Sequence, residues 1–160
     1  MNTQSKTVTS QVVSELVRKN LEFSPHDIEI FENIMTLLHA SSIVEAICRS
    51  CRILHQLFID QGVGGTILVK DEQGNEKAIF QFVDDSTQVQ SRIVRKNFEF
   101  LSNDIDIIEK LATQLKAPSF VEAVRMAGRR MNALMNAQEK GRNVIVKDAH
   151  GSEQTYLLVY

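Results

Sequence analysis

The segment VRKNLEF at residues 17–23 returns as VRKNFEF at residues 94–100. Sliding the chain along itself by 77 positions places residues 11–83 over residues 88–160 without a gap, and 29 of the 73 pairs are identical. Self-similarity at one fixed offset indicates a tandem duplication of a structural unit. The repeated segment decides the fold, because any architecture for this chain must explain why the segment is needed twice.

The repeat also divides the chain. We expect a flexible N-terminal tail at residues 1–10, a first copy at 11–83, a polar linker at 84–91 and a second copy at 92–160. Hydrophobic residues make up 43% of the 160 positions, which is enough for one core of ordinary size. The two copies are therefore either two small domains or two halves of one.

The charge balance does not by itself indicate a nucleic-acid-binding protein, since the formal net charge is −2. It is uneven, however: residues 1–83 carry 7 Lys and Arg against 10 Asp and Glu, and residues 84–160 carry 11 against 10. Any basic surface is therefore local and biased to the second copy.

Neither a membrane span nor a secretory signal is expected. No apolar run approaches the roughly 18 residues that a membrane helix needs, and the first ten residues, MNTQSKTVTS, lack the apolar stretch of a signal peptide. The cysteines are Cys48 and Cys51. A reducing, cytoplasmic location is the expectation.

The repeated segment itself reads as a β-strand, because successive side chains of a strand point to opposite faces. The core-facing set is then Val17, Lys19, Leu21 and Phe23, with Phe98 and Phe100 in the second copy. The outward-facing set is Arg18, Asn20, Glu22, Arg95, Asn97 and Glu99.

Two helices follow the strand in each copy. The first begins near Ser24-Pro25, where serine can cap and proline suits the first turn, and its counterpart is SNDIDIIEKLATQLK at residues 102–116. The second begins at Ser42 and Ser119, each followed three residues later by glutamate in the pattern of a reciprocal capping box. These second helices should end near residues 59 and 137.

Each copy ends in a predicted hairpin, at residues 66–83 and 143–160, with β-rich runs around a turn. Gly74 and Gly151 occupy equivalent places where the turn needs a positive φ. Three roles stay open for the hairpins: they extend the core, pair with each other, or mediate higher assembly.

A strand, a helix, a tight turn with serine and a second helix resemble the ribbon-helix-helix family of DNA-binding proteins. The resemblance covers residues 17–59 and 94–136 and excludes the hairpins. It implies an α+β fold in which two strands pair antiparallel over four interlocking helices. About 43 residues are too few to fold alone, so the two copies should form an intrachain pseudo-dimer, and the strand is needed twice because a ribbon has two strands.

The resemblance also implies how DNA would be bound. The outward side chains of the ribbon would enter the major groove, so the base readers would be Arg18, Asn20, Glu22, Arg95, Asn97 and Glu99. The amino ends of the second helices would lie on phosphates. With the two lysines of the ribbon, the phosphate contacts would be Lys19, Ser41, Ser42, Lys96, Pro118 and Ser119.

Other chemistry is less well supported by the sequence. Cys48 and Cys51 lie one turn before His55, but structural zinc normally needs a fourth ligand, so ordinary buried cysteines are expected. No metal site, cofactor or catalytic carboxylate pair is expected, and the chain does not read as an enzyme. Phosphate contacts are one interpretation of three arginines in the second helix of the second copy, and a solvated helix face is the favoured one; they are Arg125, Arg129 and Arg130.

The sequence therefore predicts a sequence-specific, double-stranded-DNA-binding protein, acting as a transcriptional regulator or as an accessory factor on plasmid or transfer DNA. Its site would be an imperfect palindrome, bound more strongly through the second copy. The alternative is a non-enzymatic protein-interaction module, antitoxin-like or an adaptor, on the same scaffold. A positive ribbon surface favours the first, and a neutral or acidic one with an exposed apolar patch favours the second.

Overall fold

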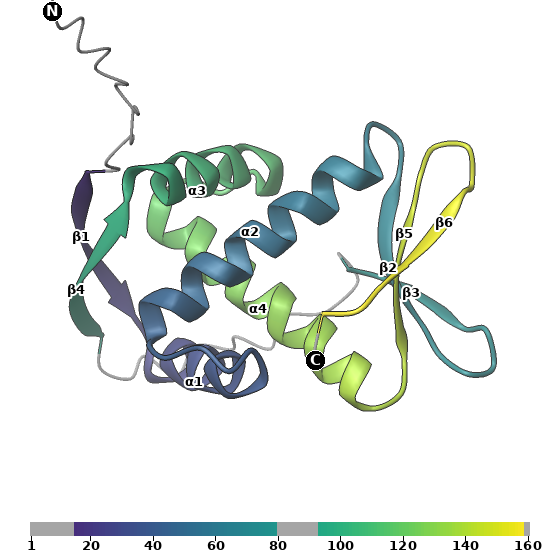
Figure 1. Cartoon of the computed structure of the whole chain (residues 1–160), viewed down its shortest axis with the longest axis horizontal. Helices are drawn as coiled ribbons and strands as arrows, with labels where there is room; N and C mark the ends of the chain where they lie inside the picture. Colours follow the sequence, from purple (N-terminus) through teal and green to yellow (C-terminus); the bar gives the residue numbers. More distant parts are fainter. Residues whose placement is uncertain (1–14, 80–92, 159–160) are drawn as a thin grey trace, which may run out of the picture.

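The computed structural model describes residues 15–79 and 93–158, so the tail predicted at 1–10 and the linker predicted at 84–91 lie outside the described residues. Within the described ranges the chain has an α+β fold of four helices and two antiparallel sheets. Figure 1 shows a two-stranded ribbon at one end of the molecule, the helices in the middle and a four-stranded sheet at the other end.

The two copies of the repeated segment form the ribbon. Strand β1 (Leu16–Phe23) pairs antiparallel with β4 (Val94–Leu101), so the expected pairing of the two segments within one chain is confirmed. The core-facing side chains meet the helices through aromatic contacts: Phe23 lies 5.7 Å from Phe31, and Phe100 lies 5.8 Å from Phe120, between ring centroids. Aromatic pairs at this spacing are favourable beyond the area they bury.

The four helices are α1 (Pro25–Leu37), α2 (Ile43–Gln61), α3 (Ser102–Leu115) and α4 (Phe120–Glu139). Helix α1 begins as its sequence predicts, because the hydroxyl oxygen of Ser24 accepts from the Asp27 N–H and the Asp27 carboxylate accepts from the Ser24 N–H. Helix α3 begins differently, with Leu101 at the capping position and therefore no side-chain cap.

The helices of the two copies interlock: α1 packs against α4, and α2 packs against α3. Gly128 shows how closely. A Cβ atom added there would lie 2.5 Å from the ring of Phe31, so only glycine lets α4 approach α1 around this phenylalanine. At the equivalent positions of the other pair stand Cys51 and Ile108. Phe31 is larger than its counterpart Ile108, and Gly128 is smaller than its counterpart Cys51, so the two differences in side-chain volume compensate.

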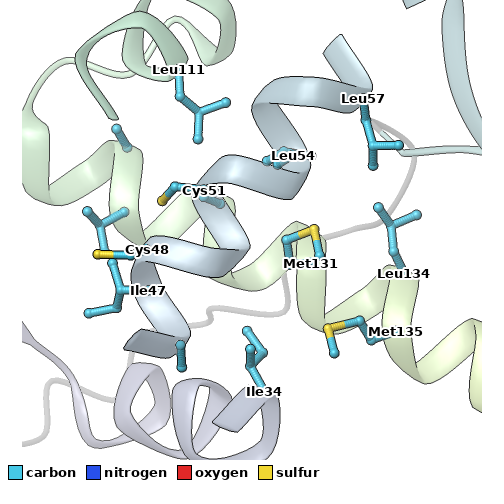
Figure 2. Packing of buried hydrophobic residues seen from close by; sticks show 14 of the residues in the cluster. Ile34, Ile47, Cys48, Cys51, Leu54, Leu57, Leu111, Met131, Leu134 and Met135 are labelled. Atoms are coloured by element: carbon cyan, nitrogen blue, oxygen red, sulfur yellow. The ribbon is translucent and has the colours of Figure 1, made fainter. Parts of the chain in front are cut away.

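The core cluster takes side chains from the ribbon, from all four helices and from the four-stranded sheet. Helices α2 and α4 cross in the centre of the molecule (Figure 1). Figure 2 shows Leu54 and Leu57 of α2 facing Met131, Leu134 and Met135 of α4. All of these side chains are buried. Of the predicted core-facing side chains of the ribbon, Leu21, Phe23 and Phe100 are buried, and Val17 and Phe98 are partly buried.

The predicted hairpins are present in both copies. They are β2 (Thr66–Lys70) with β3 (Glu76–Ala78), and β5 (Asn143–Lys147) with β6 (Glu153–Tyr156). They join through β2 and β5 into one sheet of order β3-β2-β5-β6, so the hairpins pair with each other. Gly74 and Gly151 have φ of +84° and +83°, as their turns require.

One face of this sheet extends the core, and the opposite face carries charged side chains. Ile67, Val69, Val144 and Val146 join the core cluster. On the opposite face four side chains form a closed ring of ion pairs at nitrogen–oxygen distances of 3.4 to 3.5 Å, namely Lys70, Glu76, Lys147 and Glu153. These contacts raise the pKa of Lys147 and hold the pKa of Glu153 below its ordinary value.

Candidate nucleic-acid interface

The outer ribbon face is the side of β1 and β4 that points away from the helices. It carries the six predicted base readers, Arg18, Asn20, Glu22, Arg95, Asn97 and Glu99. The arginine side chains are more open than the glutamates, at 70% exposed for Arg18 and 71% for Arg95. The alternation predicted from sequence therefore brings all six together on one accessible surface.

The strand register makes this surface nearly symmetric. Asn20 lies opposite Asn97 at the centre, Arg18 lies opposite Glu99, and Glu22 lies opposite Arg95. Each arginine forms an ion pair with the glutamate across from it, at 3.2 Å for Arg18 and 2.9 Å for Arg95. Such exposed pairs contribute between zero and about 1 kcal/mol, so they orient the arginines without locking them.

Both ends of the outer ribbon face are apolar. Leu16 lies opposite Leu101 at one end, and Ile93 stands next to β4 at the other, all three exposed. By strand alternation they point to the same side as the arginines. The sequence reasoning did not single out these residues.

The two ribbon lysines are placed unequally. The amino group of Lys19 lies 5.1 Å from the centroid of the Phe120 ring, at the start of α4. This is a cation–π contact, so Lys19 turns toward the helices instead of standing free at the ribbon edge. Lys96 is exposed.

The amino end of α2 is partly occupied by the protein's own carboxylate. The Ser42 hydroxyl oxygen accepts from the Glu45 N–H, as predicted. The reciprocal half of the predicted capping box is wrong, because the Glu45 carboxylate accepts from the N–H and the hydroxyl of Ser41, both at 2.6 Å. These bonds hold the pKa of Glu45 below its ordinary value, and they already use both donors of Ser41.

The amino end of α4 is more open. The Ser119 hydroxyl oxygen accepts from the Glu122 N–H, which caps the helix. Here too the reciprocal half of the predicted box is not formed, since the Glu122 carboxylate pairs with Arg125 at 3.4 Å. Pro118 precedes the cap and has no N–H of its own. Both Pro118 and Ser119 are exposed.

The arginines of α4 correct the sequence interpretation. Arg129 pairs with the Asp27 carboxylate at 3.2 Å, and Arg125 pairs with the same carboxylate at 3.3 Å. Arg125 also donates to the backbone oxygen of Glu22 at 2.6 Å. Asp27 is only 2% exposed, so Arg125 and Arg129 form part of a buried tie and not the solvated face that the sequence favoured.

The other copy has an equivalent tie, which the sequence reasoning missed. Arg52 of α2 donates two hydrogen bonds to the Asp104 carboxylate, at 2.7 and 2.8 Å. Arg52 and Arg129 are repeat counterparts, as are Asp27 and Asp104. Each tie joins an aspartate of one copy to an arginine of the other. The signal that would have revealed them was the survival of both residue types in both copies.

The cysteines behave as ordinary buried residues. Cys48 and Cys51 are buried and free. Burial, followed by the nearby Asp104 charge, raises the pKa of Cys48 to about 12, and burial also raises the pKa of Cys51. His55 contacts the Gln114 side chain at 2.9 Å. Among the described residues there is no group of three or more His, Cys, Asp or Glu placed to hold a metal ion.

In the described ranges no helix has the length and apolarity needed to cross a membrane. Comparison with known proteins gives no match to any family model, to any curated protein or to any solved structure.

Proposed function

We propose that the chain is a tandem ribbon-helix-helix protein whose two copies form a single-chain pseudo-dimer. The antiparallel pairing of β1 with β4 supports this arrangement. So does the packing of α1 on α4 and of α2 on α3, which places each first helix against the second helix of the other copy. Neither copy could satisfy its strand or bury its helices alone.

The function that this geometry supports best is sequence-specific binding of double-stranded DNA, with β1 and β4 lying in the major groove. The observation that carries the proposal is the exposed outer ribbon face, on which the same Arg-Asn-Glu triplet appears twice in opposite directions. The major groove is about 12 Å wide and admits a two-stranded ribbon. Arginine pairs with guanine and asparagine with adenine through two hydrogen bonds each.

The two ribbon strands taken together are net positive. The two ribbon strands carry four Lys and Arg against two Glu, whereas the whole chain is net negative. In the proposed complex Glu22 and Glu99 act mainly as positioning residues, because each already contacts the arginine opposite. An arginine held in this way reaches the groove with less conformational entropy to lose.

Phosphates would be contacted at the amino ends of α2 and α4, where free N–H groups and the helix dipole favour anions. The α4 end, with Ser119, is the more available one, because the Glu45 carboxylate already occupies the donors of Ser41 beside α2. This difference supports stronger docking through the second copy. A role in transcription, or on plasmid or transfer DNA, fits such a protein.

A second candidate function is favoured by a specific observation. The six side chains of the outer ribbon face sum to zero charge, because two glutamates balance two arginines. An apolar hollow of about 190 Å³ also lies between α2 and the end of β6, lined by Ile53, Gln56, Leu57, Tyr156, Leu157 and Leu158. A neutral ribbon and an apolar hollow are the features of a protein-interaction module.

Selection from random duplex DNA, followed by substitution of both arginines, separates the two functions. We expect an enriched, nearly palindromic site whose affinity falls steeply as salt rises. Arg18→Ala combined with Arg95→Ala should abolish the sequence preference, since each arginine–guanine pair discriminates by about 1–3 kcal/mol. Binding is measured by fluorescence anisotropy on the selected duplex.

The matched control is Lys140→Ala with Arg142→Ala. It removes two exposed positive charges next to the turn before β5, at the other end of the molecule from the ribbon. This control should keep the sequence preference and lose little affinity. If the chain enriches no sequence and shows no salt-dependent binding, the DNA proposal is wrong and the protein-interaction function takes its place.

A further inference from the structure

Leu101 occupies the N-terminal capping position of α3, where an apolar side chain is unfavourable. Its counterpart in the first copy is Ser24, which caps α1 through its hydroxyl oxygen. Leucine cannot do this, and α3 begins without a side-chain cap. Replacing a capping serine by an apolar residue destabilises a helix, because a backbone N–H of the first turn loses its acceptor. The start of α3 therefore lacks the side-chain stabilisation that the start of α1 has.

The start of α3 is held by the backbone, since the Ser102 N–H donates to the Glu15 oxygen at 3.0 Å, but the Leu101 side chain itself gains little packing among the described residues. Leu101 is 42% exposed and is not a member of the core cluster. It lies directly opposite Leu16, which is 64% exposed. Two apolar side chains thus stand together at one end of the outer ribbon face. When a residue breaks a local rule without a gain in packing, a functional surface is the usual reason.

The other end of the ribbon differs. Ile93, the counterpart of Leu16, is exposed there. Ser24 stands where Leu101 would be, and its hydroxyl donates to the Asp27 carboxylate at 2.9 Å. The central triplets are identical in the two strands. The exchange of Ser24 for Leu101 therefore distinguishes the two ends of an otherwise nearly symmetric face.

We propose that Leu16 and Leu101 contact thymine methyl groups at one flank of the DNA site and so fix the direction in which the pseudo-symmetric ribbon is bound. This inference rests on the DNA-binding function proposed above. The thymine C5 methyl is the apolar group that base edges present in the major groove. Apolar side chains on the groove-facing surface of a ribbon have that group as their natural partner.

Strand geometry places the contact. Leu16 lies two residues from Arg18 on the same face, which is about 7 Å along the strand. Base pairs are spaced by about 3.4 Å, so the thymines lie about two steps beyond the base that Arg18 reads. The opposite flank, facing Ile93 alone, should show a weaker thymine preference.

Replacing thymine by deoxyuridine tests this directly, because it removes the methyl group and leaves every hydrogen bond of the base pair. In the selected duplex, substitution at the Leu16–Leu101 flank should weaken binding about fourfold for each methyl that is buried, corresponding to about 0.8 kcal/mol. Substitution at the other flank should have a smaller effect.

Leu101→Ser is the matching variant, because it restores the residue of the first copy. It should bring the two flanks to similar sensitivity and allow the protein to bind the site in both directions. Loss of folding does not complicate this test, since a serine here supplies the missing cap and should leave the melting temperature unchanged or higher. Leu157→Ser, an exposed leucine outside the ribbon, should keep the difference between the flanks.

Two results would overturn the inference in distinguishable ways. If the protein binds a specific DNA site but deoxyuridine has the same effect at both flanks, or if Leu101→Ser keeps the direction of binding, then the apolar pair does not read thymine and DNA binding itself stands. If no DNA sequence is selected at all, both this inference and the proposed function fail.

Discussion

At the scale of single residues, two buried aspartates each join one copy to arginines of the other. Asp27 is shared by Arg125 and Arg129, and Asp104 is held by Arg52. Both carboxylates are buried, but the arginines differ, since Arg52 is 48% exposed and Arg129 only 16%. A charge left without its partner is costly in proportion to its burial.

We therefore predict that Asp27→Asn destabilises the fold by about 3 kcal/mol, because it removes the buried carboxylate that two largely buried arginines share and leaves them the longer contacts with Glu122. Asp104→Asn should have a clearly smaller effect, since Arg52 can turn to water. Urea unfolding followed by circular dichroism measures both. Similar losses of less than about 1 kcal/mol in the two variants would show that the ties add little to stability.

At the scale of elements, the two helix contacts between copies are built from different residues. Phe31 of α1 fits over Gly128 of α4, whereas Ile108 and Cys51 occupy the equivalent positions of α3 and α2. Interiors are packed at crystal-like density, so volume gained on one helix must be given up on its partner. The repeat has diverged here by a compensated exchange, and each helix is now matched to its partner in the other copy.

Gly128→Ala should accordingly destabilise the protein by about 1–3 kcal/mol through overpacking against Phe31. This is expected even though alanine favours an isolated helix by about 1 kcal/mol over glycine. Adding Phe31→Leu should recover much of the loss, so the two changes together should be less harmful than the sum of each alone. Thermal unfolding of the three variants provides the comparison. Simple additivity would mean that the ring and the glycine are not coupled.

At the scale of the whole molecule, the ribbon, the helix layer and the four-stranded sheet each take strands or helices from both copies. A single copy would leave a lone strand, half of the helix contacts and an isolated hairpin. Small units of this kind rarely fold alone. The duplication therefore replaces the association of two subunits by a covalent link.

Separate fragments should show this dependence. We predict that residues 1–83 and residues 84–160, made as two chains, fold poorly alone and form a one-to-one complex when mixed. The mixed complex should be favoured over either homodimer, because Phe31 would meet Cys51 in one homodimer and Ile108 would leave a gap at Gly128 in the other. Native mass spectrometry and circular dichroism would detect it. Two fragments that fold independently as monomers would contradict the shared architecture.

The sequence by itself determined the elements and their faces. Its repeat, its alternation over VRKNLEF and its helical spacing are local or periodic signals, and they placed the strands, the helices, the turns at Gly74 and Gly151 and the outward side of the ribbon. The pairing of β1 with β4 was also within reach, because a lone strand needs a partner and the chain supplied one.

Only the tertiary structure showed which residues far along the chain the arginines of α4 and the exposed leucines of the ribbon contact. Local spacing cannot tell a solvated arginine from one that reaches a buried carboxylate about a hundred residues away, so Arg125 and Arg129 were misread. Nor can it show that Glu45 turns to Ser41, that the hairpins join through β2 and β5, or that Leu16 and Leu101 meet across the ribbon. These contacts depend on how whole helices and strands are placed relative to one another. That placement is fixed only when the complete chain packs.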